Sequence, residues 1–137
     1  MDFREIAKGD LAVDEGRRKK PYRCTADKLT IGIGRNLEDK GLRDDEIDYL
    51  FAHDLQDAET DARVLFPTFD SLSEIRKAVL VNMAFQLGRD RLGGFKGVRA
   101  AVASGDFTRA ADEMLDSRWA TQTTARAFRL AKMMREG

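Results

Sequence analysis

Apolar residues recur every three or four positions along most of the chain, which is the spacing of one face of an α-helix. One segment, Tyr22 to Arg35, differs, because its Thr30-Ile31-Gly32-Ile33-Gly34 stretch alternates branched residues with glycine. Such alternation is typical of a strand that another group approaches closely, so we predict a small hairpin or three-stranded sheet there. The helical spacing predicts helices at residues 3–13, 43–65, 75–87, 97–103, 106–115 and 124–134.

The long helix at 43–65 has one apolar stripe and a largely acidic opposite face, and Phe66-Pro67 ends it. We expect His53 to be an exposed residue of this helix. The stripe consists of Ile47, Leu50, Phe51, Leu55, Ala58, Ala62 and Leu65.

Residues 75–87 are apolar nearly all round, which is typical of a buried central helix. Ser71-Leu72-Ser73-Glu74 fits a capping box at its start, and Gly88 is a C-cap candidate at its end. Three large side chains in this half of the chain are expected in the core, namely Met83, Phe85 and Trp119.

With 137 residues, the chain is long enough to bury about two-thirds of its unfolded surface as one domain. One Cys and one His leave no disulfide framework and no Cys/His zinc site, so we expect no metal and no cofactor. The formal net charge of zero gives no overall attraction to nucleic acid. A basic run at 17–23 and an acidic stretch at 44–61 are either solvated faces, or an acidic helix opposite basic surfaces that meet an anionic polymer.

The first residues lack the basic segment and apolar run of a secretory signal, and no stretch approaches the ~18 apolar residues of a membrane span. We therefore expect a protein made in the cytoplasm, without a signal peptide and without stable membrane insertion.

Three residues around the β segment could carry chemistry: Glu15, Cys24 and Thr30. Glycoside hydrolysis needs an acid for the leaving oxygen, and an inverting enzyme also needs a base for water. A glutamate at the end of a helix and two groups on the following sheet would meet where two lobes join, and pockets form at such junctions. Each residue also has a plain structural explanation, as a surface glutamate, a buried small side chain and a strand former.

Eight residues separate Glu15 from Cys24, and five separate Cys24 from Thr30. This spacing resembles the phage-type lysozymes of glycoside hydrolase family 24, whose pattern is Glu, eight residues, Asp or Cys, five residues, Thr. Further matching stretches follow in the family's order, and the resemblance covers most of residues 11–130. They are Leu50-Phe51, Asp54, the run from Asn82 to Gly88, Gly94-Phe95, Ser117-Arg118-Trp119, Gln122-Thr123 and Arg126.

The resemblance implies an α+β, mainly helical lysozyme-like fold that forms one domain over residues 1–137. A small N-terminal antiparallel β-sheet lobe at 14–42 would be joined by a connecting helix at 43–66 to a helical C-terminal lobe. That lobe would cover 67–137 and pack with the helix at 3–13.

The resemblance also implies an endolysin, a muramidase that hydrolyses the β-1,4 bond between N-acetylmuramic acid and N-acetylglucosamine in bacterial peptidoglycan. Glu15 would be the general acid, Cys24 and Thr30 would position or activate water, and Arg126 would support the acid by pairing with it. Substrate-binding residues are expected at Gly34, Arg35, Asn36, Phe85, Gln86, Ser117 and Arg118.

The partners that follow are the glycan strands of peptidoglycan, bound by a monomer. The family further implies a holin that opens the host membrane, so that the enzyme moves from the host cytoplasm to the periplasm or wall and lyses the cell.

Several alternatives stay open at this point. Cys24 could be a base, a water-positioning group or a nucleophile that acts with retention, since an ordinary thiol of pKa ~8.5 is mostly protonated at neutral pH. The family's histidine is Arg35 here and could pair with Asp54. Rival functions are a cysteine peptidase or amidase that uses Cys24 with His53, and a non-catalytic wall-binding module with the same fold.

Overall fold

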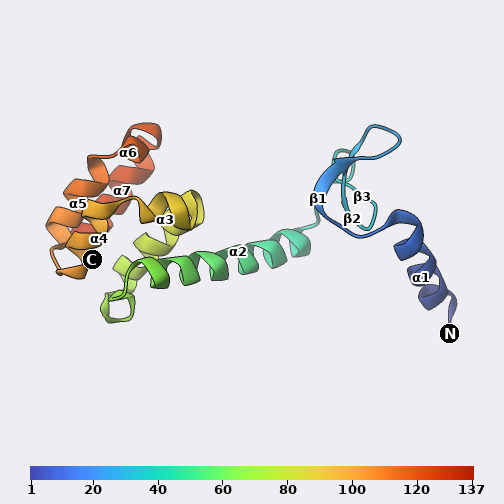
Figure 1. The fold of residues 1–137 in the computed structure, drawn as a ribbon, viewed down its shortest axis with the longest axis horizontal. Coiled ribbons are helices and arrows are strands. Elements are labelled where there is room, and N and C mark those ends of the chain that lie inside the picture. Colours follow the sequence, from blue (N-terminus) through green and yellow to red (C-terminus); the bar gives the residue numbers. More distant parts are fainter. The chain divides into compact units, whose positions relative to one another are not determined.

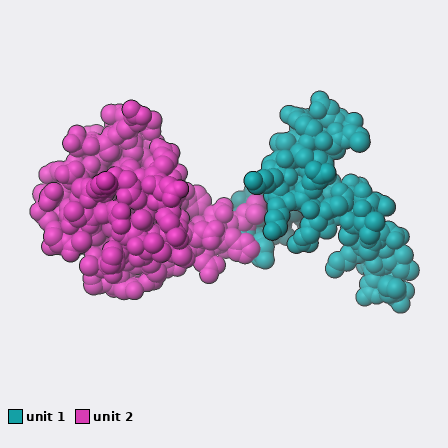
Figure 2. Space-filling view, in the orientation of Figure 1, with its two compact units in different colours: residues 1–49 teal, residues 50–137 magenta.

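The computed structural model describes residues 1–137 and confirms a mainly helical α+β fold with one small antiparallel sheet (Figure 1). The chain divides into two compact units, residues 1–49 and residues 50–137, which are coloured separately in Figure 2. We call them unit 1 and unit 2. In chain order the elements are α1 (Phe3–Glu15), β1 (Arg18–Arg23), β2 (Leu29–Gly32), β3 (Arg35–Asn36), α2 (Asp44–Leu65), the 3₁₀ turn η1 (Phe69–Ser71), α3 (Glu74–Gly93), α4 (Lys96–Ala103), α5 (Phe107–Leu115), α6 (Arg118–Gln122) and α7 (Thr124–Glu136).

Unit 1 contains α1 and the sheet, whose strand order is β1-β2-β3 with both pairs antiparallel. Tyr22 pairs with Thr30, and Arg18 pairs with Gly32 across an irregular stretch of β1. The predicted three-stranded sheet is thus confirmed, although its first strand begins at Arg18 and not at Tyr22. The first residues of β1 are exposed and charged, so they give no apolar alternation that a period rule could detect.

Unit 1 has almost no hydrophobic core, because Thr30 is its only buried residue. Caps and turns shape its backbone instead. Asp2 caps α1 by accepting from the backbone N–H of Glu5 at 3.1 Å, and Gly16 follows the helix with φ 74°. None of the residues of α1 is buried, and the expected packing of the helix at 3–13 with the helical lobe stays a prediction.

Unit 2 contains the hydrophobic core. The core joins the C-terminal part of α2 to α3, α4, α5, α6 and α7. Met83 and Trp119 are buried there as expected, whereas Phe85 is 44% exposed and contacts Phe51 edge-to-face. The expectation that Phe85 is a core residue was therefore wrong. The largest fully buried side chains are Phe66, Leu80, Met83, Leu92, Met114, Leu130 and Met134.

The apolar stripe of α2 is buried only over its last three members, and the members before Ala58 remain exposed. The N-cap of α3 is Ser73, which accepts from the backbone N–H of Arg76 at 3.2 Å, so the helix starts two residues after Ser71 and the expected capping box of Ser71 with Glu74 was wrong. Gly88 interrupts the helix with φ 80° as predicted, but α3 then continues to Gly93. No helix combines the length and the apolar character needed to cross a membrane.

Candidate active site

Glu15 is the last residue of α1, and its carboxyl lies against the backbone of Gly34. A Cβ atom placed on Gly34 would be 2.8 Å from Glu15 Oε2 and 2.9 Å from Glu15 Cδ. Gly34 lies in the turn between β2 and β3 and has φ +68°, in the left-handed region that favours glycine. The fold therefore brings the end of a helix and a turn of the sheet into direct contact at the expected acid.

Cys24 follows β1 in a tight turn that leads to β2. Its backbone N–H donates to the carbonyl of Lys28 at 3.0 Å, and the N–H of Asp27 donates to the Cys24 carbonyl at 2.8 Å. Hydrogen bonds from the backbone of Lys28 and then of Ala26 lower the pKa of the Cys24 thiol below its ordinary value, against a smaller opposing effect of burial. The turn thus favours the thiolate without any cationic side chain.

Thr30 lies on β2, and its side chain is hydrogen-bonded to the same turn. The hydroxyl donates to the carbonyl of Lys28 at 2.8 Å, and it also helps to lower the pKa of Cys24. A hydroxyl carries one proton, so Thr30 can donate to only one of these two acceptors at a time. At 4% exposure, Thr30 is buried beside the thiol.

The register of the sheet orders these residues along one hairpin. Glu15 and Gly34 lie toward the end of β1 at Arg18, because Arg18 pairs with Gly32. Cys24 lies beyond the other end of β1, where β2 begins. The structure therefore places Glu15 and Cys24 near opposite ends of one six-residue strand.

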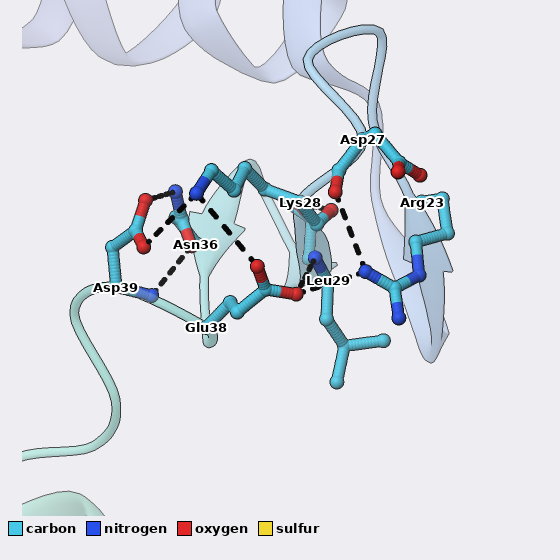
Figure 3. A network of polar contacts seen from close by, with 8 residues as sticks. Arg23, Asp27, Lys28, Leu29, Asn36, Glu38 and Asp39 are labelled. Atoms are coloured by element: carbon cyan, nitrogen blue, oxygen red, sulfur yellow. Dashed lines mark hydrogen bonds and ion pairs between the residues drawn. The ribbon is translucent and has the colours of Figure 1, made fainter.

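A polar network holds the Cys24 turn against the segment after β3 (Figure 3). Glu38 Oε1 accepts from Arg23 Nη1 at 2.8 Å and from the Leu29 backbone N–H at 3.4 Å. Lys28 Nζ lies 3.7 Å from Glu38 Oε2 and 3.3 Å from Asp39 Oδ1. These contacts replace the apolar packing that would otherwise fix such a turn.

Asn36, an expected substrate-binding residue, has its amide engaged inside the same network (Figure 3). Its Nδ2 donates to Asp39 Oδ2 at 3.0 Å, and its Oδ1 accepts from the Asp39 backbone N–H at 3.0 Å. Both ends of the amide thus close the turn after β3.

Arg35 forms a bidentate ion pair with Glu46 in the first turn of α2, with both N–O distances 2.6 Å. The side-chain hydrogen bonds from Arg35 lower the pKa of Glu46 to about 2, helped by the backbone N–H of Arg43. The partner of Arg35 is therefore Glu46, and the expectation of Asp54 was wrong. No motif marked Glu46 in the sequence, because its role depends on where α2 begins relative to β3.

The remaining expected site residues lie in unit 2, and two of them, Gln86 and Arg126, tie α3 to α6 and α7. Arg126 donates from Nε and Nη2 to Asn82 Oδ1 at 2.9 and 2.7 Å. Gln86 Oε1 accepts from Trp119 Nε1 at 2.8 Å. Arg126 and Phe85 line a cavity of about 860 Å³.

Ser117 and Arg118 stand at the start of α6, an element too short for the apolar period to predict. Ser117 is the N-cap, and its Oγ accepts from the backbone N–H of Ala120 at 3.2 Å. Both residues line a second pocket of about 390 Å³ together with Trp119. The expected substrate-binding set is therefore divided between the two units.

The model of the family described as phage lysozyme matches residues 12–133, a range that includes Glu15, Cys24 and Thr30. The "Pre-baseplate central spike protein Gp5" of Enterobacteria phage T4 is 29% identical over 93% of this chain, which spans only 27% of that protein's length. "Probable T4-type lysozyme 1" and "Probable T4-type lysozyme 2" of Dictyostelium discoideum are 28% and 26% identical, each over 93% of this chain and 92% of the relative.

Proposed function

The chain belongs to the phage lysozyme family, and from this premise we propose that it is a muramidase. It hydrolyses the β-1,4 bond between N-acetylmuramic acid and N-acetylglucosamine in the glycan strands of bacterial peptidoglycan, and it acts in host cell lysis. The observation that carries this proposal is the family match over residues 12–133, which spans the whole Glu15, Cys24 and Thr30 pattern.

In the proposed mechanism, Glu15 protonates the oxygen of the leaving sugar. That oxygen leaves poorly as an alkoxide, so a positioned acid contributes about 10²–10⁴-fold to the rate. The contact of Glu15 with Gly34 supports this role, because it holds a carboxyl at the junction of α1 and the sheet. We keep Arg126 as the residue that supports the acid, on the strength of the family resemblance.

Cys24 and Thr30 hold and activate the attacking water in this proposal. The lowered pKa of Cys24 supports it, because a thiolate is a better proton acceptor for water than a thiol. A retaining mechanism needs its two reacting groups about 5–5.5 Å apart, whereas an inverting one leaves about 6.5–9.5 Å for water. The stereochemistry at the anomeric carbon of the product distinguishes the two mechanisms.

A cysteine peptidase or amidase is the less favoured function. That chemistry needs a base beside the thiol, usually a histidine that a third group orients. The groups that lower the pKa of Cys24 are backbone amides and the Thr30 hydroxyl. None of these can take the proton of the thiol as a general base does.

The test is a lysis assay on cells with permeabilised outer membranes, combined with analysis of the released fragments. The natural protein is expected to clear the suspension and create new reducing ends, while new amines would instead indicate peptide cleavage. Glu15→Gln should remove nearly all of the activity without loss of fold. Asp14→Asn changes an exposed carboxyl at the position before Glu15; it is the matched control and should stay active. Substantial lysis by a folded Glu15→Gln protein would overturn the assignment of the acid.

A further inference from the structure

We infer that Gly34 is a positioning residue for the acid and that it does not serve mainly as a substrate contact. The inference rests on the proposed function only through the role of Glu15. The space beside the Gly34 Cα, where any other residue has its Cβ, is occupied by the Glu15 side chain. An added Cβ would lie 2.8 Å from Oε2, 2.9 Å from Cδ and 3.1 Å from Cγ of Glu15.

Gly34 requires glycine for two reasons, its positive φ and the Glu15 side chain beside its Cα. A second glycine of the chain, Gly32, allows the two to be tested apart. Gly34 has φ +68°, which strains any residue with a Cβ. Gly32, two positions earlier and the last residue of β2, has φ +69°, but a Cβ there would meet nothing within 4 Å. An alanine at either position therefore causes nearly the same backbone strain, and only an alanine at Gly34 displaces Glu15.

The displaced group decides what kind of damage follows. All three atoms that crowd the added Cβ belong to the outer part of the flexible Glu15 side chain, which can rotate away. The added Cβ therefore destabilises the fold little beyond the backbone strain that it shares with an alanine at Gly32. The catalytic rate is more sensitive, because a shift of about 1 Å in a reacting group costs about 10²-fold in rate.

The experiment measures kcat, KM and Tm on a soluble peptidoglycan fragment for Gly34→Ala and Gly32→Ala. We expect Gly34→Ala to lower kcat about 100-fold with KM changed less than about threefold. Gly32→Ala should keep kcat within about threefold, and both variants should lower Tm by similar amounts because the strain is similar. A purely structural role for Gly34 would move Tm and leave this difference in kcat absent.

A second comparison uses the length of the acid. Glu15→Asp withdraws the carboxyl from Gly34 by one methylene, so it lowers activity by itself but removes the two shortest contacts, those with Oε2 and Cδ, and leaves only the 3.1 Å contact with Cγ. Adding Gly34→Ala to Glu15→Asp should then cost less than about threefold in kcat, against about 100-fold in the natural background.

The outcomes separate this inference from the proposed function. Equal losses of kcat in Gly34→Ala and Gly32→Ala, or an undiminished loss in the Glu15→Asp background, would overturn the positioning role and leave the muramidase standing. A rise in KM with unchanged kcat would also overturn it, since that is the signature of a substrate contact. Full activity of Glu15→Gln would overturn the proposed acid itself.

Discussion

Residues 1–49 bury one side chain, that of Thr30, whereas residues 50–137 bury the whole apolar core. Unit 1 nevertheless carries Glu15, Cys24 and Thr30, all three of the residues to which we assign the chemistry. Its geometry comes from turns, from the antiparallel sheet and from charged side chains such as those around Glu38. The two units therefore obtain their shape from different forces.

This difference predicts how each unit responds to mutation. A segment of about 50 residues without an apolar core lies near the lower limit of independent stability. Regions with few buried apolar contacts also open at lower free energy than the core of the same protein. Changes in unit 1 should therefore affect activity more than global stability, and changes in the core of unit 2 should do the reverse.

The largest expected effect on stability comes from Leu80→Ala, at a fully buried position of α3. Truncation of a buried leucine costs about 2–5 kcal/mol in the free energy of unfolding, because it removes apolar burial and leaves a cavity. Leu42→Ala in unit 1, where Leu42 is 41% exposed, is the matched control and should cost less than about 0.5 kcal/mol. Denaturant unfolding measures both free energies. Equal costs for the two leucines would remove the contrast between the units.

Cys24 gives the sharpest test on the side of activity. Cys24→Asp should be active, because an aspartate of pKa ~3.9 is ionised at neutral pH and can polarise a water. Cys24→Ala should be impaired but not inactive, since Thr30 remains as a partner of the water. The natural protein should gain activity as pH rises through the pKa of the thiol, so its pH optimum should lie above that of Cys24→Asp. Product stereochemistry provides the decisive measurement, because retention or a trapped glycosyl thioether on Cys24 would make the cysteine a nucleophile.

Thr30→Val provides the companion measurement on the thiol itself. The valine keeps the shape of the threonine and removes the hydroxyl that helps to lower the pKa of Cys24. The pH dependence of thiol alkylation should therefore shift to higher pH in Thr30→Val. An unchanged alkylation profile would show that the backbone N–H groups of Lys28 and Ala26 act alone.

The sequence predicted the helices and the sheet well where apolar side chains repeat, and less well elsewhere. The start of β1 was missed because Arg18, Lys19 and Lys20 are exposed and charged, so no face of the strand is apolar. The five-residue α6 is too short to show a period. Two serines fit the rule for the N-cap of α3, and the structure uses the second, Ser73, because the chain is still extended at Leu72.

The spacing pattern identified the residues of the candidate site, but none of the contacts that position these residues or shift their pKa values. The pairing of Arg35 with Glu46 and the contact of Gly34 with Glu15 join segments that only the tertiary fold brings together. The groups that lower the pKa of Cys24 are mostly backbone amides, which every residue but proline has, so no residue type reveals them. Such contacts have no signature in the order of residues.

Arg126 tests whether unit 2 contributes to chemistry as well as to stability. The guanidinium of Arg126 donates two hydrogen bonds to the Asn82 side chain in α3 and a longer one, at 3.4 Å, to the Asn82 backbone carbonyl. Arg126→Ala and Asn82→Ala both remove the two side-chain bonds, so each should cost about 1 kcal/mol of stability. If Arg126 also supports the acid, Arg126→Ala alone should lower kcat about tenfold, which corresponds to ~1.4 kcal/mol in the transition state. Steady-state kinetics on both variants decides the matter. Equal kcat values for the two variants would restrict Arg126 to a structural role.

The smallest expected effect concerns the ion pair of Arg35 with Glu46, which helps to fix unit 1 without apolar burial. The pKa of Glu46 is about 2 in the folded protein, below the ~4.3 of an unfolded glutamate. The folded state thus binds fewer protons at Glu46 than the unfolded state. The stability from this pair is therefore complete above about pH 4.3 and is lost as pH falls toward 2.

Glu46→Gln should remove that component of the pH dependence, and hydrogen exchange of the β2 and β3 amides should report it. Asp48→Asn, at an exposed position of α2, is the control and should leave the profile unchanged. Because 23% of the Arg35 side chain and 32% of the Glu46 side chain are exposed, water screens the pair and keeps the effect small. An NMR titration of the Glu46 carboxyl gives its pKa directly. A midpoint near 4.3 would mean that unit 1 holds its shape without this ion pair, by the turns and the sheet alone.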